Sequence, residues 1–333
     1  MTVMKENKIK KILVIRTGAI GDVVHTTGLI HSIKNTAPDV QIHYMTDPIL
    51  DFMLKNDFSV EKVIPVDKKF KPFSHYTFNL AKELRKENYD AAINLQPSFK
   101  IRLLVFLAGI KKEFIYKKDF KVHAVKNFWQ TGLKAFPDMK EEKNLKIYLS
   151  KETTLRAKER LKQFKRPFIV INAGGMFSKR QGRTYPVDRW IELGNKIQQK
   201  YSGTIILNGA KEDRDFLSPL NNIKNSVNFI GELSLEDSCA VISQADLMIS
   251  GDSGPLHIAT ALGIKSVGLY GSMPARRTGC YSNGINIISN KKCVPCNRRK
   301  CKYLKNSNKI YAPCMEEIKT DTILDAIDKY LKE

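Results

Sequence analysis

The stretch ILVIRTGAIGDVVHT, residues 12–26, carries the strongest indication of the fold. It begins with an unbroken apolar run, which is typical of a strand buried on both faces of a parallel sheet. Residues 17–22 then form a short loop that contains two glycines, and an amphipathic helix is expected over 23–35. A strand, a glycine-containing loop and a helix in this order are the opening unit of an α/β domain.

The same alternation continues along the chain, in one run that ends near residue 108 and a second that starts at residue 168. Strands that alternate with helices predict doubly wound parallel sheets. A chain of 333 residues suits two medium domains better than one core. The expected strands are 12–16, 42–45, 60–66, 91–95, 168–172, 204–207, 227–230, 247–250 and 266–270, and the expected helices are 23–35, 47–55, 78–86, 101–108, 191–199, 234–244, 256–262 and 320–332.

A strongly charged segment, 137–166, separates the two runs and contains one expected amphipathic helix over 152–164. We interpret this segment as the connection between domains. The sequence therefore predicts an N-terminal Rossmann-like domain at 1–165 and a C-terminal Rossmann-like domain at 166–333. The second domain includes a cysteine-rich segment at 293–314 and the terminal helix.

The chain has a formal net charge of +22, from 56 Lys and Arg residues against 34 Asp and Glu residues. Such a field favours anionic partners, and nucleic acid, an anionic membrane surface and phosphorylated small molecules are the candidates. The basic residues are spread along the chain, and no zinc-finger spacing, RNA-binding aromatic signature or basic zipper accompanies them. Nucleic acid is therefore not the expected partner.

The sequence gives no sign of export or membrane insertion. Residues 1–10 are polar and charged, unlike the apolar core of a secretory signal. The longest near-continuous apolar run, 103–110, is far too short to span a bilayer. We therefore expect a cytoplasmic protein.

Two motifs follow expected strands, at the edge where open α/β sheets bind ligands. The first is RTGAIGDVVHT, residues 16–26, in which Gly18 and Gly21 permit a tight turn with exposed backbone N–H groups. Its spacing differs from the dinucleotide fingerprint. Asp22 falls at the start of the helix, where it either faces the ligand crevice or acts as a helix cap or first-turn acid. His25 is a candidate for the same site or for the core.

The second motif is DLMISGDSGPLHIATALG, residues 246–263. The backbone N–H groups of Ser253 and Gly254 are expected at a helix N-terminus, which is a ready anion site. Asp252 is placed to accept hydrogen bonds from sugar hydroxyls, and His257 follows within the first turn of the helix. An ordinary strand–turn–helix is the alternative, but it does not explain why these four residue types meet in one turn.

Four of the six cysteines lie close together in the sequence, at Cys293, Cys296, Cys301 and Cys314. In a reducing cytosol such a cluster more often binds metal than forms disulfides. Cys-x2-Cys is a common half of a metal site, and two further thiolates complete a tetrahedron. We therefore predict a structural zinc or iron site, with zinc favoured on general grounds. Reduced thiols in a surface loop and redox-dependent disulfides are the alternatives.

Together, GAIGDVVHT at residues 18–26 and SGDSGPLHIA at residues 250–259 resemble the motifs of glycosyltransferase family 9, the ADP-heptose:lipopolysaccharide heptosyltransferases. The order and separation of the motifs fit the family, and the cysteine segment is similar to one in many members. The resemblance implies an α/β GT-B fold, in which two Rossmann-like doubly wound domains face each other across a cleft. The acceptor would bind the N-terminal half and the nucleotide-sugar the C-terminal half.

The resemblance also implies roles for the two motifs. Asp22 matches the family's proposed general base. The residues around it would form an acceptor or anion loop, namely Arg16, Thr17, Gly18, Gly21 and His25. The donor-binding turn of the family is matched by Asp252, Ser253, Gly254 and His257.

Two further donor elements match less closely. The family's Lys-x-Trp-Pro element falls within residues 172–186, where either Lys179 or Arg183 would bind the diphosphate and Tyr185-Pro186 stands for Trp-Pro. The turn NGAKED, residues 208–213, resembles the segment that contacts the donor nucleoside. Glu212 is the candidate there, with Asp213 equally placed.

The implied activity is an inverting, metal-independent transfer of heptose from ADP-heptose to the inner core of lipopolysaccharide, with a lipid A–core acceptor. Neither motif contains Asp-x-Asp, so no cofactor is expected for catalysis. A glycolipid acceptor at the inner membrane would give the basic surface a use in peripheral membrane binding.

Two alternatives remain open at this point. One is a related transferase that glycosylates an autotransporter protein or another glycan, in a branch with a four-cysteine iron site. The other is a basic, non-enzymatic protein that binds nucleotides or nucleic acid.

Overall fold

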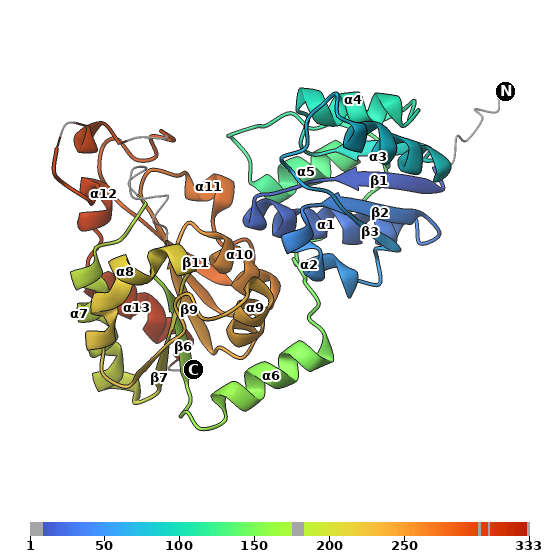
Figure 1. Ribbon diagram of the computed structural model, residues 1–333. Helices are drawn as coiled ribbons and strands as arrows, with labels where there is room; N and C mark the ends of the chain where they lie inside the picture. The colour runs from blue at the N-terminus through green and yellow to red at the C-terminus, as the bar shows by residue number, and fades with distance from the viewer. Residues whose placement is uncertain (1–8, 175–182, 299–300, 306, 332–333) are drawn as a thin grey trace. The chain divides into compact units, whose positions relative to one another are not determined.

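The fold consists of two compact units, Met1–Lys143 and Asn144–Glu333. In the computed structural model the described residues are 9–174, 183–298, 301–305 and 307–331. Each unit is built on one parallel sheet with helices on its faces (Figure 1). The predicted fold class, with two Rossmann-like α/β domains, is confirmed.

The sheet of the first unit has the strand order β3-β2-β1-β4-β5, with every pair of neighbours parallel. β1 takes the centre because its apolar run, Ile12 to Ile15, is fully buried. The chain leaves β1 in one direction and returns to its other side with β4, so the switch point of the sheet lies between these two strands. The strands are β1 (Lys11–Ile15), β2 (Gln41–Thr46), β3 (Lys62–Pro65), β4 (Ala91–Asn94) and β5 (Glu113–Ile115).

Helices cover both faces of this sheet (Figure 1). α3 and α4 pack together on one face, where their apolar residues join Leu13 and Ile15 in a common core. α1 and α5 pack against each other, and a Cβ at Gly132 would lie 2.3 Å from Leu29 Cδ1, so glycine permits their close approach. The helices are α1 (Ile20–Thr36), α2 (Phe52–Lys55), α3 (His75–Lys86), α4 (Phe99–Leu107) and α5 (Ala124–Gly132), with a 3-10 turn η1 (Pro48–Leu50) before α2.

The sheet of the second unit has the strand order β11-β10-β9-β6-β7-β8, again with parallel neighbours. Its switch point lies between β6 and β9. The strands are β6 (Phe168–Asn172), β7 (Thr204–Asn208), β8 (Ser226–Asn228), β9 (Leu247–Gly251), β10 (Ser266–Tyr270) and β11 (Gly284–Ile288). The helices are α7 (Val187–Tyr201), α8 (Arg214–Leu217), α9 (Leu235–Ser243), α10 (Gly254–Ala261), α11 (Ala275–Thr278), α12 (Pro313–Glu316) and α13 (Thr320–Leu331), with 3-10 turns η3 (Lys211–Asp213), η4 (Ser218–Asn222) and η5 (Lys302–Leu304).

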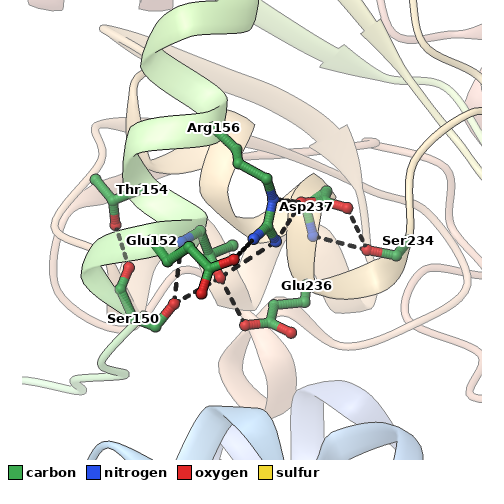
Figure 2. Close-up of polar contacts among 8 residues, drawn as sticks. Ser150, Glu152, Thr154, Arg156, Ser234, Glu236 and Asp237 are labelled. Atoms are coloured by element: carbon green, nitrogen blue, oxygen red, sulfur yellow. Dashed lines mark hydrogen bonds and ion pairs between the residues drawn. The ribbon is translucent and has the colours of Figure 1, made fainter.

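Helix α6 (Lys151–Leu161) belongs to the second unit, so the division between units comes before the boundary expected at residue 165. It packs on α9, as Figure 2 shows. Arg156 Nη2 donates to Asp237 Oδ1 at 2.9 Å, and Thr153 Oγ1 donates to Glu236 Oε1 at 2.8 Å. These contacts hold α6 to α9 of the second unit.

No helix in the described part of the chain is long and apolar enough to cross a membrane.

Candidate functional site

The first predicted motif forms the loop between β1 and α1, at the switch point of the N-terminal sheet. Gly18 has a φ of +145°, a backbone conformation that side chains disfavour. The N-cap of α1 is Ala19, so Asp22 lies inside the first helical turn and is not the cap. The cap interpretation of Asp22 therefore does not hold, although its charge still suits the positive end of the helix dipole.

Asp22 is held by an ion pair with Arg16. Arg16 is fixed in turn, because its Nη1 donates to the carbonyl oxygen of Leu95 at 2.6 Å and its guanidinium lies over the ring of Phe128. The Asp22 side chain keeps 30% of its surface exposed. The loop thus presents an oriented, solvent-accessible carboxylate at the edge of the sheet where ligands bind.

Three of the other predicted loop residues, Thr17, Gly21 and His25, are buried, and Gly18 is half-buried. Thr17 donates its backbone N–H to Gln96 Oε1 at 3.1 Å, which ties the ends of β1 and β4 together. His25 is buried, and its ring stands edge-on to the ring of His123 at 5.3 Å between centroids. Gly21 is buried as well. Of the predicted loop residues, Arg16 and Asp22 are therefore the two that combine a charge with access to solvent.

The second predicted motif lies at the switch point of the C-terminal sheet, where β9 ends and α10 begins. The side chain of Asp252 is buried, with only 8% of it exposed, between Arg183 and His257. Its Oδ2 lies 3.2 Å from Arg183 Nη1, and its Oδ1 lies 3.7 Å from His257 Nε2. Burial alone would raise the pKa of Asp252, but His257 and Arg183 hold it below its ordinary value. The carboxylate is therefore charged at neutral pH.

Ser253 is the N-cap of α10, but its side chain makes no capping hydrogen bond. Its Oγ instead lies 2.8 Å from Ser250 Oγ, and Asn172 Nδ2 donates to both serine hydroxyls, at 3.2 Å to Ser250 and 3.4 Å to Ser253. The first backbone N–H groups of α10, around Gly254, are thus left without a side-chain cap. This arrangement leaves the helix N-terminus open to an anion.

A chain of hydrogen bonds links this turn to the ends of β6 and β7 and to α9. Ser238 Oγ donates to Asn208 Oδ1 at 2.8 Å, and Asn208 Nδ2 donates to Asn172 Oδ1 at 3.1 Å. Asn172 then reaches the two serines of the turn. Asn172 and Asn208 are polar residues that end two buried apolar strands, and that signal could have identified them from the sequence.

The structure places the weaker donor-binding candidates differently. Arg183 joins the site through Asp252, whereas Lys179 lies outside the described residues. Glu212 is exposed, but Asp213 is buried, and its Oδ2 lies 2.6 Å from where a Cβ on Gly174 would stand. The structure thus brings Asp213, and not Glu212, to the end of β6.

Tyr185 is a core residue. It is buried, its hydroxyl donates to the carbonyl oxygen of Ile318 at 3.0 Å, and its ring stands edge-on to Trp190. Its contacts therefore join the start of α7 to the segment before α13.

The four clustered cysteines line one cavity of about 360 Å³. Burial and the nearby thiols of Cys301, Cys293 and Cys296 raise the pKa of Cys314 to about 11. Within the described ranges, no three His, Cys, Asp or Glu side chains are close enough to hold a metal ion. The cysteines share a pocket without forming a ready ligand cluster.

The chain is similar to known proteins of one family. Residues 77–306 match the model of glycosyltransferase family 9 (heptosyltransferase). The chain is 24% identical over 306 residues to the lipopolysaccharide core heptosyltransferase OpsX of Haemophilus influenzae, with 84% of each protein covered.

Solved structures share the fold. A glycosyl transferase family 9 protein of Veillonella parvula superposes with a TM-score of 0.81 at 20% identity, over 98% of both chains. The E. coli ADP-heptose lps heptosyltransferase II gives 0.77 at 19% identity, over 97% of this chain and 98% of that one. The iron-containing dodecameric glycosyltransferase TibC of enterotoxigenic E. coli gives 0.60 at 14% identity, over 98% of this chain and 77% of that one.

The family model spans more than half of the chain, and the fold of both units is that of solved family members, the GT-B fold. The chain therefore belongs to glycosyltransferase family 9, the heptosyltransferase family, and is a glycosyltransferase.

Proposed function

We propose that the protein transfers heptose from ADP-heptose to the inner core of lipopolysaccharide, on a lipid A–core acceptor. The names of its relatives and solved neighbours support this donor and acceptor. The observation that carries the proposal is the pair of switch-point sites, one with an accessible carboxylate and one with an uncapped helix N-terminus beside a buried charge cluster.

In the proposed reaction, Asp22 accepts the proton of the acceptor hydroxyl as its oxygen attacks the anomeric carbon. The attack comes from the face opposite the leaving diphosphate, so the anomeric configuration inverts. Arg16 holds the carboxylate through their ion pair, and 30% of the Asp22 side chain stays exposed. The remaining loop residues, Thr17, Gly18, Gly21 and His25, shape the backbone that holds these two side chains.

The donor is proposed to bind at the turn before α10. Negative charge that develops on the departing ADP is stabilised by the backbone N–H groups around Gly254 and by a nearby cation. Arg183 is one candidate for that cation, because 27% of its side chain stays exposed while it holds Asp252. Lys179 is the other candidate for the diphosphate.

The contacts of the donor sugar and nucleoside are proposed from the same geometry. Asp252, fixed between Arg183 and His257, is oriented to accept hydrogen bonds from sugar hydroxyls. Asp213, at the end of β6, is better placed than Glu212 to meet the nucleoside. We also propose that the reaction requires no divalent metal and that it takes place in the cytoplasm, at the inner face of the membrane.

We further propose that the four-cysteine pocket holds a structural zinc or iron ion. Its support is the convergence of four thiols on one cavity, a chemistry that suits tetrahedral zinc or iron. Because no three ligand side chains among the described residues are close enough to hold a metal ion, binding would have to bring the thiols of this pocket closer together.

Elemental analysis of the anaerobically purified protein should find about one metal ion per chain, as a four-thiolate site requires. Replacement of Cys293 and Cys296 by serine should abolish it, whereas Cys239→Ser, at a buried cysteine of α9, should leave it in place. A parent protein with neither zinc nor iron would refute the metal site.

A panel of nucleotide-sugars tests the donor. We expect ADP release in the presence of acceptor to be fastest with ADP-heptose. Transfer to a protein or to another glycan, with the lipid A–core acceptor ignored, would favour the related transferase. Salt-dependent binding of DNA or RNA with no turnover of any nucleotide-sugar would contradict the enzymatic proposal.

A further inference from the structure

Exposed phenylalanines are distributed unevenly over the chain. Among the residues that the structure describes, every phenylalanine in the group of exposed large apolar side chains belongs to the first unit. These residues are Phe58, Phe73, Phe78, Phe99, Phe106 and Phe120. Large apolar side chains that gather on a surface mark an interaction site more often than single ones do.

Two of these rings form a pair. Phe73 and Phe99 are 70% and 66% exposed, yet their centroids are only 6.1 Å apart. Phe99 begins α4, which buries Ile101, Leu104 and Val105 against the sheet and still carries Phe106 on its outer surface. α4 therefore carries large apolar side chains on its exposed surface as well as in the core, together with the exposed Arg102.

Lysines lie close in sequence to both rings of this pair. Lys69 and Lys71 are exposed in the segment that follows β3, and Lys100 Nζ lies 4.7 Å from the centre of the ring of Phe70, which also contacts the ring of Tyr76. The sequence from residue 91 to residue 112 contains no acidic residue. We call the group of Phe73, Tyr76, Phe99, Lys69, Lys71 and Lys100 the aromatic–lysine patch.

The patch lies at the carboxyl edge of the sheet, the same edge as Asp22. Phe99 follows β4 closely, and Gln96 between them accepts the hydrogen bond from the backbone N–H of Thr17 in the β1–α1 loop. The segment that carries Lys69, Lys71 and Phe73 follows β3 at that edge, and α3 and α4 lie together (Figure 1). The patch and the proposed acceptor loop therefore lie at the same edge of the sheet.

We propose that the aromatic–lysine patch docks the enzyme on an anionic lipid bilayer. Phe73 and Phe99 would enter the boundary between headgroups and acyl chains, while the lysines would contact lipid phosphates, as on interfacial helices with mixed apolar and basic residues. The location of the docking surface has a use only if the proposed function holds. A lipid-anchored acceptor would then present its sugars at the edge of the sheet that carries Asp22.

The charge of the patch favours a bilayer over a second copy of the chain. A symmetric self-contact places each patch against its own copy. The lysines would then oppose one another in a chain that already carries a net charge of +22, and such like-charge contact is unfavourable. An anionic surface removes that repulsion.

Binding to vesicles tests the docking surface. The full chain should sediment with vesicles of phosphatidylcholine mixed with phosphatidylglycerol, and much less with phosphatidylcholine alone. The double variant Phe73→Ser/Phe99→Ser should lower the partition coefficient by about tenfold or more, because two exposed rings no longer leave water. Lys69→Glu/Lys71→Glu should also lower it by about tenfold or more.

Matched controls come from the opposite edge of the same sheet. Phe58→Ser lies just before β3 and Lys111→Glu/Lys112→Glu just before β5, and all three side chains are exposed. These variants should bind vesicles as the parent does. Equal loss in the controls, or undiminished binding of the Phe73→Ser/Phe99→Ser variant, would overturn the proposal. A parent dimer in light scattering that this variant abolishes would assign the patch to a second copy instead.

The docking surface and the proposed reaction can fail separately. With an acceptor freed of its acyl chains, Phe73→Ser/Phe99→Ser should turn over at the parental rate, because its defect lies in membrane binding. If that variant binds vesicles normally but the parent transfers heptose, only the docking surface is wrong. If the parent transfers no heptose to either acceptor yet binds vesicles through the patch, the proposed function is wrong and the docking surface stands.

Discussion

Replacement of Asp22 by Asn should lower the turnover number by roughly a hundredfold or more, because the amide cannot accept the proton of the acceptor hydroxyl. Binding of the donor should remain near that of the parent, since the donor is proposed to bind the second unit. Steady-state rates with both substrates, together with titration of ADP-heptose into the variant, measure the two effects separately.

Stability distinguishes this role of Asp22 from a structural one. The amide oxygen of the Asp22→Asn variant can still accept a hydrogen bond from Arg16, and a partly exposed ion pair contributes only about 0.2–1 kcal/mol to the free energy of unfolding. The melting temperature should therefore change little. Asp39→Asn, at an exposed carboxylate after α1, serves as the control that alters charge alone. An Asp22→Asn variant that melts like the parent and transfers sugar near the parental rate would show that the loop has only a structural role.

Replacement of Asp252 by Asn should weaken binding of ADP-heptose by about tenfold or more, since a charged hydrogen-bond acceptor at a buried site is lost. Arg183 and His257 lose their common anionic partner at the same time, and their orientation beside the donor is relaxed. Acceptor affinity should stay unchanged. Isothermal titration with ADP-heptose and with ADP provides the measurement, and unchanged donor affinity in a folded variant would place the donor elsewhere.

The lowered pKa of Asp252 predicts that the stability of the fold depends on pH. Because the pKa of Asp252 is lowered in the folded protein, its charge stabilises the fold above the ordinary carboxyl range, and that contribution is lost as the pH falls through the folded-state pKa. The parent should therefore lose more stability on acidification than Asp252→Asn does, as denaturant titrations at a series of pH values would show.

The sequence predicts most closely the strands that are buried apolar runs. Strands 168–172 and 266–270 were predicted with the bounds of β6 and β10. β5 was missed because it has only three residues and begins with a glutamate, and β11 because it mixes glycine and asparagine with apolar residues. The helix expected over 47–55 forms as η1 followed by α2, because Asp47 caps a 3-10 turn that starts at Pro48.

The site was predictable where its residues are neighbours in sequence. The Asp22 loop and the Asp252 turn each follow a strand, so their positions can be predicted from the local sequence pattern. The contacts of Arg16 with Leu95 and of Asp252 with Arg183 join separate elements, and no local pattern specifies them. The same holds for the hydrogen bonds that run from Ser238 through Asn208 to Asn172.

The mass of the acceptor glycolipid after incubation with ADP-heptose tests the central claim most directly. We expect a gain of one heptose per acceptor and the release of an equal amount of ADP. Neither product should form when ADP-heptose or the acceptor is omitted. An acceptor of unchanged mass, or ADP released by hydrolysis without any glycosylated product, would contradict the proposed transfer.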